Sequence, residues 1–289
     1  MNLARITAAI PVSWLKAISH AQWRHPLLKR AFNFAANRFR NRDGTIQRGA
    51  GKGLRFNTGR SNAGYLLGTT EPMVQTAFTR LVQPGMVVYD IGANVGFLTV
   101  IAARLAGPAG SVVAFEPLPE NFEHIRHNAS LNQMAHVIVR PEAISDTDGK
   151  ARFQVSAEPT WGNLVDAGKE IRLLQGTTEV KVSRLDSLLR SEELPSPDLI
   201  KIDVECAEAK VLRGAADTLR RLRPLLLIEL HGTNQAIARV LDDFDYVGFV
   251  LGDTRAVADS AWDAYVAAAP REEKERVAAA RALTRVTAN

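Results

Sequence analysis

Strand-like apolar runs alternate with amphipathic helical patterns along most of this chain of 289 residues. Each run is short and is followed by apolar residues at the three- and four-residue spacing of a helix. Strands are expected at 86–91, 111–115, 136–139, 199–202, 225–230 and 246–250, and helices at 97–105, 121–131, 207–222 and 235–241. Parallel strands need such helical crossovers. The alternation therefore predicts an α/β fold with a doubly wound, mostly parallel sheet.

Three other segments interrupt this alternation. Residues 43–62 are rich in Gly, Asn and Arg, which predicts a loop or a short hairpin. Two more strands are expected at 151–155 and 180–182, on either side of an irregular stretch at 156–178. The end of the chain, 260–284, is rich in alanine and charged residues and is predicted to be helical.

Basic residues are concentrated near the N-terminus. Residues 1–60 contain twelve Lys and Arg and one acid, Asp43, whereas the rest contains 24 basic and 30 acidic residues. Apolar residues within 1–42 recur at helical spacing, so we expect a basic helical extension that packs on the domain or contacts an anionic membrane surface. Because the body of the chain is mildly acidic, the pI of 9.5 does not favour a nucleic acid as partner.

Composition limits the class of protein further. A single cysteine, Cys206, leaves no internal disulfide framework, and no apolar run approaches the roughly 18 residues of a membrane-spanning helix. A soluble chain of a reducing compartment is expected. The predicted location is therefore the cytoplasm, with or without peripheral contact at the inner face of the membrane.

A glycine-rich turn follows the first expected strand, in the run Asp90-Ile-Gly-Ala-Asn-Val-Gly96. Gly92 and Gly96 let the backbone turn sharply and approach a ligand, and the amides near Asn94 and Gly96 favour an anionic group. Asp90 would repel the pyrophosphate of a dinucleotide. S-adenosylmethionine (SAM) is therefore the better candidate: Asp90 would face its ammonium, directly or through water, and the amides would bind its carboxylate.

The next two strand ends offer positions for the nucleoside half of this ligand. Glu116 follows the second strand and is expected to accept hydrogen bonds from both ribose hydroxyls. Asn121 is expected to cap the helix that follows. After the third strand, backbone groups near Ala143 or the carboxylate of Asp146 would bind the exocyclic amine of adenine, although turn propensity explains the same residues.

Acidic residues and a histidine follow the fourth and fifth strands. Asp203 and Glu205 come directly after 199–202, and Glu229 and His231 lie at the end of 225–230. Buried carboxylates without partners are costly in a scaffold, so we expect these side chains to meet in one cleft. Histidine takes up a proton near neutral pH, whereas a loop histidine bonded to the backbone is the structural alternative.

Several motifs, in this order and spacing, resemble the FkbM-type family of SAM-dependent methyltransferases. They are Gly68-Thr-Thr-Glu71, Pro84-Gly85, Asp90–Gly96, Ala114-Phe-Glu-Pro117, Asn128 with Asn132, Leu185-Asp186, Lys201–Glu205 with Ala207-Glu208, Leu212-x-Gly214, and Arg223-Pro224 before Ile228-Glu229. The resemblance implies a methyltransferase domain over 68–252, with a basic helical extension and loop at 1–67 and a helical tail at 253–289. It also implies a class I, Rossmann-like sheet of seven strands, SAM as cofactor, and a hydroxyl of a sugar, polyketide or other small metabolite as acceptor.

The resemblance also assigns individual positions. Gly92, Asn94 and Gly96 fall in the SAM loop, and Glu71 matches an acid near the methionine end of the cofactor. Asp90 and Glu116 keep the methionine and ribose positions already inferred. The family has glycine where this chain has Cys206, and a cysteine held at positive φ would cost about 1 kcal/mol.

The predicted chemistry is methyl transfer to a hydroxyl, which must lose its proton as the new bond forms. His231 is the expected base and Asp203 the second choice, whereas Glu205 would orient the hydroxyls of the acceptor and Glu229 would contact it. No metal is required by this scheme. In a metal-dependent version, Asp203, Glu205 and Glu229 would offer oxygen ligands for Mg²⁺.

Two residues of the irregular stretch, Trp161 and Asn163, are expected to contact the acceptor as part of a lid.

Two other functions of the protein stay open. A non-catalytic SAM-binding or interaction protein on the same fold would bind SAM without turnover. An RNA or DNA methyltransferase is disfavoured, because no Asn/Asp-Pro-Pro-aromatic run follows the fourth strand.

Overall fold

The structure is a computed structural model that describes residues 41–62, 64–156, 162–164, 174–191 and 194–287. The basic helical extension expected over 1–42 lies almost wholly outside these residues. Within them, no helix combines the length and the apolar character that a membrane span needs.

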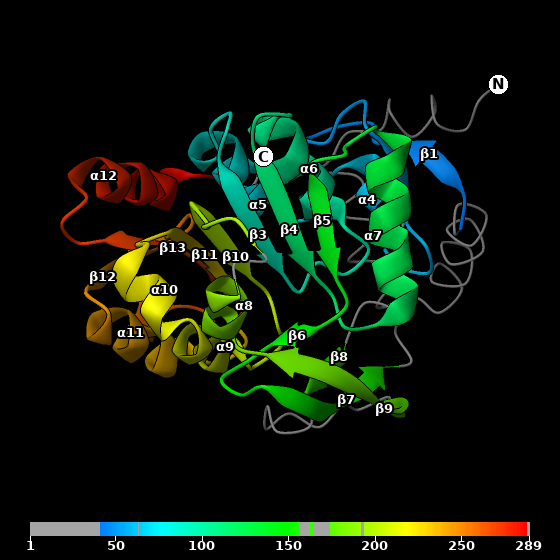
Figure 1. The fold of residues 1–289 in the computed structure, drawn as a ribbon. Coiled ribbons are helices and arrows are strands. Elements are labelled where there is room, and N and C mark those ends of the chain that lie inside the picture. Colours follow the sequence, from blue (N-terminus) through cyan, green and yellow to red (C-terminus); the bar gives the residue numbers. More distant parts are fainter. Residues whose placement is uncertain (1–40, 63, 157–161, 165–173, 192–193, 288–289) are drawn as a thin grey trace, which may run out of the picture.

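A seven-stranded sheet forms the centre of the fold, in the order β12-β13-β11-β10-β3-β4-β5 (Figure 1). Its strands are β3 (Val87–Ile91), β4 (Ser111–Phe115), β5 (Val137–Arg140), β10 (Leu199–Ile202), β11 (Leu225–Glu229), β12 (Tyr246–Val250) and β13 (Tyr265–Pro270). Only β13 runs antiparallel to its neighbours in this sheet. The predicted doubly wound, mostly parallel α/β fold is confirmed.

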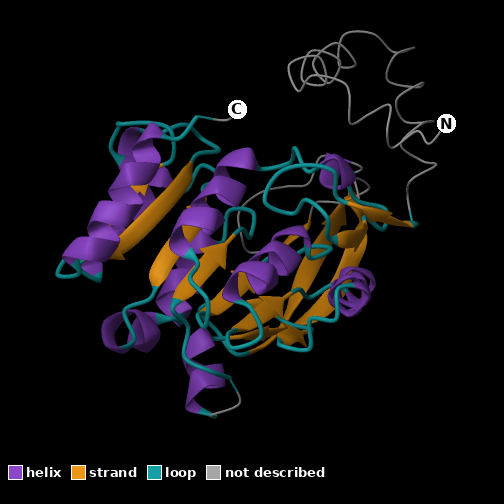
Figure 2. Cartoon of the chain, turned by 90° about the horizontal axis from the view of Figure 1, so that it is seen from above, coloured by secondary structure: helices purple, strands orange, loops and turns teal. Residues whose placement is uncertain are grey.

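Helices cover both faces of this sheet (Figure 2), because its strands are apolar on both sides. Val88 and Leu227 pack into one core with α5, α6 and α12, whereas their neighbours Tyr89 and Leu226 pack into a second core with α8, α9, α10 and α11. The helices are α4 (Gly64–Leu67), α5 (Pro72–Leu81), α6 (Phe97–Ala106), α7 (Pro119–Leu131), α8 (Leu185–Arg190), α9 (Glu208–Gly214), α10 (Ala216–Arg221), α11 (Asn234–Asp243) and α12 (Lys274–Ala282).

Two smaller sheets flank the main one. β1 (Asp43–Thr45) and β2 (Arg55–Asn57) pair antiparallel, so the short hairpin predicted at 43–62 is confirmed. A four-stranded sheet has the order β6-β9-β7-β8, formed by β6 (Ala143–Ile144), β9 (Leu174–Ser183), β7 (Gly149–Ser156) and β8 (Gly162–Leu164). The stretch 156–178 was predicted to be irregular, but it contains β8 and the first half of β9.

The helix predicted over 260–284 is wrong for its first half. Residues Tyr265–Pro270 form β13, which lies between β11 and β12. A short 3-10 turn at Val257–Asp259 precedes β13, and another at Leu283–Arg285 follows α12. Val266 and the three alanines after it are completely buried. Small side chains suit a strand covered on both faces, and this burial overrides the helix preference of alanine. The seventh strand therefore comes from the predicted helical tail.

The register of the parallel strands brings their carboxyl ends level. Ile202 pairs with Ile91 on one side and with Ile228 on the other, and Ile91 pairs with Phe115. The residues that follow these four strands therefore meet along one edge of the sheet.

Candidate active site

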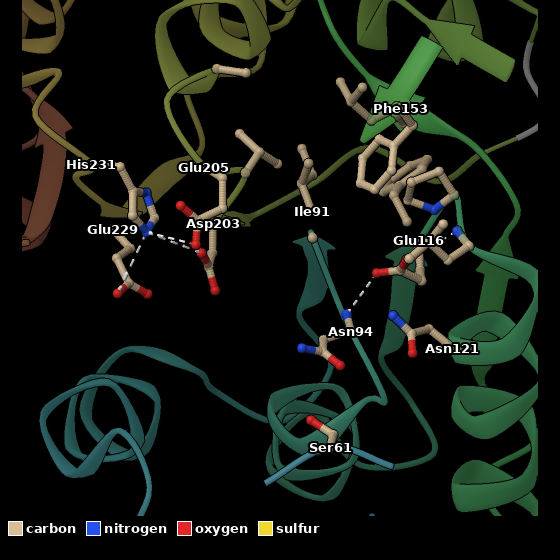
Figure 3. A pocket seen from close by; sticks show the side chains of 18 of the residues that line it. Ser61, Ile91, Asn94, Glu116, Asn121, Phe153, Asp203, Glu205, Glu229 and His231 are labelled. Carbon is tan, nitrogen blue, oxygen red and sulfur yellow. Dashed lines mark hydrogen bonds and ion pairs between the residues drawn. The ribbon is translucent and has the colours of Figure 1, made fainter. Parts of the chain in front are cut away.

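A cavity of about 490 Å³ lies at the carboxyl ends of β3, β4, β10 and β11. Ligands of doubly wound sheets bind at this edge. Figure 3 shows Glu116 and Phe153 on one side of the cavity, Ile91 and Asn94 in the middle, and the group around His231 on the other side. The cavity thus has an end suited to a nucleoside and an end rich in titratable groups.

The turn after β3 is shaped by Gly92. Its φ is 78°, and a Cβ there would lie only 1.8 Å from the carbonyl oxygen of Asp203. Glycine alone permits this contact, so the turn packs directly against the segment that carries Asp203. Gly92 and Asn94 line the cavity, whereas Gly96 is not among the described residues that do so.

The amides of this turn are already used within the protein. The Asn94 N–H donates to Glu116 Oε2 at 3.0 Å, and the Gly96 N–H donates to the Ala93 carbonyl at 2.8 Å. These two amides therefore already have acceptors, and the contact predicted between amides near Asn94 and Gly96 and a ligand carboxylate stays a prediction.

Glu116 is buried and is held by several donors. Besides Asn94, the Leu118 N–H donates to Oε1 at 3.0 Å and the Asn121 side chain donates to the same carboxyl group. Burial raises the pKa of Glu116 to about 7, although these hydrogen bonds oppose the shift. A carboxylate offers about four lone-pair sites, so it keeps room for a ligand hydroxyl.

The capping role predicted for Asn121 is wrong. Pro119 begins α7, so Leu118 occupies the N-cap position and Asn121 lies inside the first turn. Proline is favoured at the first helical position because its φ is already helical. The first turn brings the Asn121 amide to Glu116 instead.

The surroundings of Asp90 contradict the contact predicted between this residue and a ligand ammonium. It is completely buried, it accepts a hydrogen bond from Thr99 Oγ1 at 2.6 Å, and its Oδ1 lies 3.0 Å from Lys201 Nζ. Lys201 projects from β10 and also lies 3.5 Å from Asp203. Burial disfavours the ammonium, but Asp90 and Asp203 outweigh this and raise the pKa of Lys201. The cation opposite Asp90 therefore comes from the protein itself.

Glu71, predicted to lie near the methionine end of the cofactor, lines the cavity. Its Oε2 is buried and has no hydrogen-bond partner in the part of the chain that the structure describes. Burial, followed by the charge of Asp203, raises the pKa of Glu71 to about 7. An unpartnered buried carboxylate is costly, and a ligand ammonium would supply both the charge and the donors that it lacks. This chemistry fits the methionine end of SAM.

At the nucleoside end of the cavity, Ala143, Ile144 and Phe153 of the four-stranded sheet form an apolar wall. Asp146 is not among the described residues that line the cavity. It lies 3.7 Å from Arg213 and accepts a hydrogen bond from Ser145 instead. The predicted contact between Asp146 and adenine is therefore wrong, whereas the contact predicted near Ala143 stays a prediction.

Asp203, Glu205, Glu229 and His231 meet in one cleft, as the strand ends predicted. His231 Nε2 lies 3.8 Å from Asp203 Oδ1, 3.7 Å from Glu205 Oε1 and 3.8 Å from Glu229 Oε1 (Figure 3). These distances are longer than hydrogen bonds, so Nε2 faces a space bordered by three carboxyl groups. All four side chains line the cavity.

Glu208 is a residue of this site that sequence reasoning left without a role. Its Oε1 lies 2.6 Å from His231 Nδ1, and its Oε2 accepts a hydrogen bond from Thr233 Oγ1 at 2.9 Å. A carboxylate only accepts, so Nδ1 carries the proton and Nε2 is left to face the cavity. The sole sequence signal was the place of Glu208 in the motif that begins at Lys201.

The acidic residues surrounding His231 determine its charge. Burial disfavours the imidazolium, but the hydrogen bond with Glu208 and the charges of Glu205 and Asp203 outweigh this and raise the pKa of His231 to about 9. Burial, followed by Asp203, also raises the pKa of Glu229 to about 8. His231 is therefore protonated at neutral pH in the ligand-free protein, and a bound cation would favour release of that proton.

The predicted lid is only partly described. Trp161 lies outside the described residues, and of Asn163 the structure gives the backbone, which pairs with Gln154. Two other aromatic residues line the cavity beside His231, namely Trp262 and Tyr265. Sequence reasoning missed both, because they precede and begin the strand that was predicted as a helix.

A divalent ion would find possible ligands in the same cleft. Ligand atoms of Asp203, Glu229 and His231 all lie within 4.8 Å of one another. This trio contains His231 in place of Glu205, which was predicted as a ligand. A nitrogen that binds a metal cannot also accept a proton, so only a metal bound by His231 would exclude this residue as base, whereas one bound by the carboxyl groups alone would not.

The topology of the main sheet and the cavity at its carboxyl edge define a class I SAM-methyltransferase fold, which is Rossmann-like. The family described as "Methyltransferase FkbM domain" matches residues 90–251. Because this match covers more than half of the chain, the chain belongs to the FkbM methyltransferase family.

Curated relatives carry related names. Hexuronic acid methyltransferase AglP of Haloferax volcanii is 30% identical over 145 residues, which cover 50% of this chain and 56% of AglP. 31-O-demethyl-FK506 methyltransferase FkbM of Streptomyces tacrolimicus is 31% identical over 186 residues, covering 55% of this chain and 70% of that protein. The match thus spans little more than half the length of AglP. The crystal structure of methyltransferase FkbM from Methylobacillus flagellatus KT superposes with a TM-score of 0.44 at 17% identity, over 63% of this chain and 43% of that one.

Proposed function

We propose that this protein transfers a methyl group from SAM to a hydroxyl of a sugar, a glycolipid or another small metabolite. The observation that carries the proposal is the cavity itself, which is lined both by Glu71, whose Oε2 has no hydrogen-bond partner among the described residues, and by His231, whose Nδ1 is bonded to Glu208. The relatives named above support it, because their names describe methyltransferases acting on a hexuronic acid and on demethyl-FK506.

In this proposal four groups of the chain hold the cofactor. Glu71 binds the ammonium, Glu116 accepts from a ribose hydroxyl, and the Gly92 turn allows close approach of the backbone. Phe153 and Ala143 border the adenine. When bound, SAM supplies a methyl group on a sulfonium, which is a good leaving group.

The other end of the cavity orients the acceptor and takes up its proton. Glu208 fixes the ring of His231 so that Nε2 faces the acceptor hydroxyl and accepts its proton, with Asp203 as the second candidate. Lys201 holds one oxygen of Asp203 at 3.5 Å, which leaves the other toward His231. Glu205 and Glu229 accept hydrogen bonds from further acceptor hydroxyls. General-base help of this kind contributes about 10²–10⁴-fold to rate.

Calorimetric titration with SAM, with NAD as the control ligand, is the first test. We expect micromolar SAM binding and no NAD binding, followed by transfer of labelled methyl groups in a screen of sugars and glycolipids. A folded sample that does not bind SAM contradicts the proposal. SAM binding without turnover of any acceptor would instead favour a non-catalytic SAM-binding protein.

Metal removal separates the two chemical schemes. We expect turnover to survive dialysis against EDTA, because His231 needs no ion to accept a proton. Turnover that is lost and then restored by Mg²⁺ would instead favour a metal site in this cleft, with ligands among Asp203, Glu205, Glu229 and His231. Cytoplasmic location and membrane contact through residues 1–42 stay predictions.

A further inference from the structure

A large aromatic side chain lies exposed at the acidic end of the cavity. Trp262 is 52% exposed, and it is one of three large hydrophobic residues exposed in the described part of the chain. The other two, Ile138 and Leu222, are not among the described residues that line the cavity. Exposed indole surface at a pocket is a frequent sign of ligand contact, since it offers a large apolar face beside polar groups.

The indole is held in place by its surroundings. The Gly232 N–H donates to the Trp262 carbonyl at 2.9 Å, and a Cβ on Gly232 would lie only 2.3 Å from the indole Nε1. The ring also packs edge-on against His231, with 5.9 Å between ring centroids. A side chain fixed in this way loses little conformational freedom when a ligand binds.

Trp262 and the carboxyl groups near His231 together match the two faces of a sugar ring. The C–H face of a pyranose is apolar and stacks on an indole, whereas its hydroxyls donate to carboxylates. A ring hydroxyl that donates to Nε2 at about 2.8 Å brings the ring itself next to Trp262. Asp203, Glu205 and Glu229 would then accept from neighbouring hydroxyls.

The charge of the site selects among sugars. Five carboxyl groups, those of Glu71, Asp203, Glu205, Glu208 and Glu229, lie at or beside this end of the cavity. Lys201 and His231 are the cationic side chains in contact with them, and Arg60 is a further cation among the described residues that line the cavity. Glu71 and Glu229 are partly protonated near neutral pH, because their pKa values are raised to about 7 and about 8. A carboxylate on the acceptor would add negative charge to this poorly solvated cluster and would be repelled by the groups that remain ionised. An uncharged sugar avoids this cost, and an amino sugar gains from it.

We propose that Trp262 is the stacking platform of an acceptor subsite that binds the ring of a neutral or amino sugar and rejects a uronic acid. The inference rests on the proposed function, because the place of the ring depends on a hydroxyl facing His231. It separates this chain from AglP, whose name describes a hexuronic acid acceptor.

The test uses the full chain and saturation-transfer NMR, with and without S-adenosylhomocysteine. The probes are methyl glucoside, methyl galactoside, methyl mannoside, methyl glucosaminide and methyl glucuronide. The glucoside and the glucuronide are a matched pair that differs only at C6. We expect at least one neutral or amino pyranoside to bind ten times more tightly than the glucuronide.

Substitutions then test the platform. Trp262→Ala should weaken pyranoside binding about tenfold, and Trp262→Phe should keep part of it, while SAM affinity stays unchanged in both. Leu222→Ala, which removes an exposed side chain elsewhere, is the control and should change neither affinity.

Three results would overturn the inference: tighter binding of the glucuronide, no binding of any pyranoside by a folded protein that binds SAM, or unchanged pyranoside affinity in Trp262→Ala. Failure of the proposed function has a different signature, namely a folded protein that does not bind SAM. The titrations without nucleotide then still decide whether Trp262 holds a sugar.

Discussion

Glu208 illustrates how a residue outside the cavity lining controls the chemistry inside it. It is completely buried in the first turn of α9, and both of its oxygens are engaged, by His231 and by Thr233. Its contact with Nδ1 orients the imidazole, and its charge contributes to the raised pKa of that ring. Orientation and charge are separate effects, and a substitution can separate them.

Glu208→Gln should lower the pKa of His231 from about 9, because the amide keeps an acceptor for Nδ1–H but removes the negative charge. The measurement is an NMR titration of the His231 ring in both proteins, which needs no acceptor. Once an acceptor is known, the rise of turnover with pH should move to lower pH in the variant. A purely structural role would lower turnover at every pH and leave the midpoint unchanged.

Glu116→Ala should weaken SAM binding about 10–100-fold, the usual effect of losing hydrogen bonds to a charged group. Part of this loss would come from the Asn94 and Leu118 amides, which lose their acceptor. Glu123→Ala is a suitable control, because Glu123 lies on α7, the helix that follows Glu116, and its side chain is 65% exposed. Equal SAM affinity in wild type and Glu116→Ala would remove Glu116 from the ribose role.

At the scale of elements, the turn between β10 and α9 carries unusual backbone geometry. Glu205 has a φ of 39° and Cys206 a φ of 69°, so two successive non-glycine residues are left-handed. Cys206 therefore has the positive φ at which a cysteine is expected to cost about 1 kcal/mol. Such strain is frequent at functional sites, where the surrounding structure enforces it.

Cys206→Gly should stabilise the protein by about 1 kcal/mol, since glycine adopts a positive φ without steric cost. The change also removes the contact of Cys206 Sγ with the His231 carbonyl at 3.2 Å, which is a weak hydrogen bond. Urea unfolding of both proteins measures the difference, with SAM affinity as the check that the site is intact. A lower midpoint in the variant would mean that the sulfur contact outweighs the strain.

The elements that sequence predicted well are those with one dominant signal. The six strands β3, β4, β5, β10, β11 and β12 were each placed to within one residue at either end, because their apolar runs are bounded by polar or glycine residues. β13 was missed because its alanine run has no such signal, and only burial between two strands makes it a strand. The helix predicted over 207–222 is interrupted at Ala215, next to Gly214, whose missing side chain lets Ser145 pack against it.

The sequence likewise predicted some residues of the candidate site and missed others. Glu116, Asp203, Glu229 and His231 were found because residues after parallel strands must meet at one edge. The partners of these residues depend on contacts between distant elements, as in the pairing of Lys201 with Asp90, and no local pattern encodes them. Trp262 was missed because it lies just before β13, whose alanine run was predicted to be a helix.

The whole molecule combines a basic N-terminal segment with a cavity whose charge is of the opposite sign. Residues 1–60 hold a third of the Lys and Arg of the chain, whereas the cavity collects carboxyl groups around His231. Charges crowded within a poorly solvated cavity affect stability more than the same number spread over a surface. The pH dependence of folding should therefore report on the cavity.

The free energy of unfolding of the ligand-free protein should fall as the pH rises from about 5 to about 9. His231 has its pKa raised from 6.5 to about 9, so its stabilising contribution is complete below 6.5 and is lost as the pH rises through 9. Glu229 has its pKa raised from 4.5 to about 8, so ionising it in the folded state costs stability over that interval. Both groups bind protons more tightly in the folded state, which gives both contributions the same sign.

Glu229→Gln isolates the second contribution, because the amide cannot ionise. The difference in unfolding free energy between variant and wild type should shift in favour of the variant as the pH rises from about 5 to about 8. Glu275→Gln, at an exposed position on α12, should show a constant difference over the same range. Denaturant unfolding at several pH values measures both. Saturating SAM should reduce the pH dependence of wild-type stability, because its positive charge offsets the carboxyl groups of the cavity. The same pH dependence in both variants, and no effect of SAM on the wild type, would mean that crowded charge in the cavity does not control the stability of the fold.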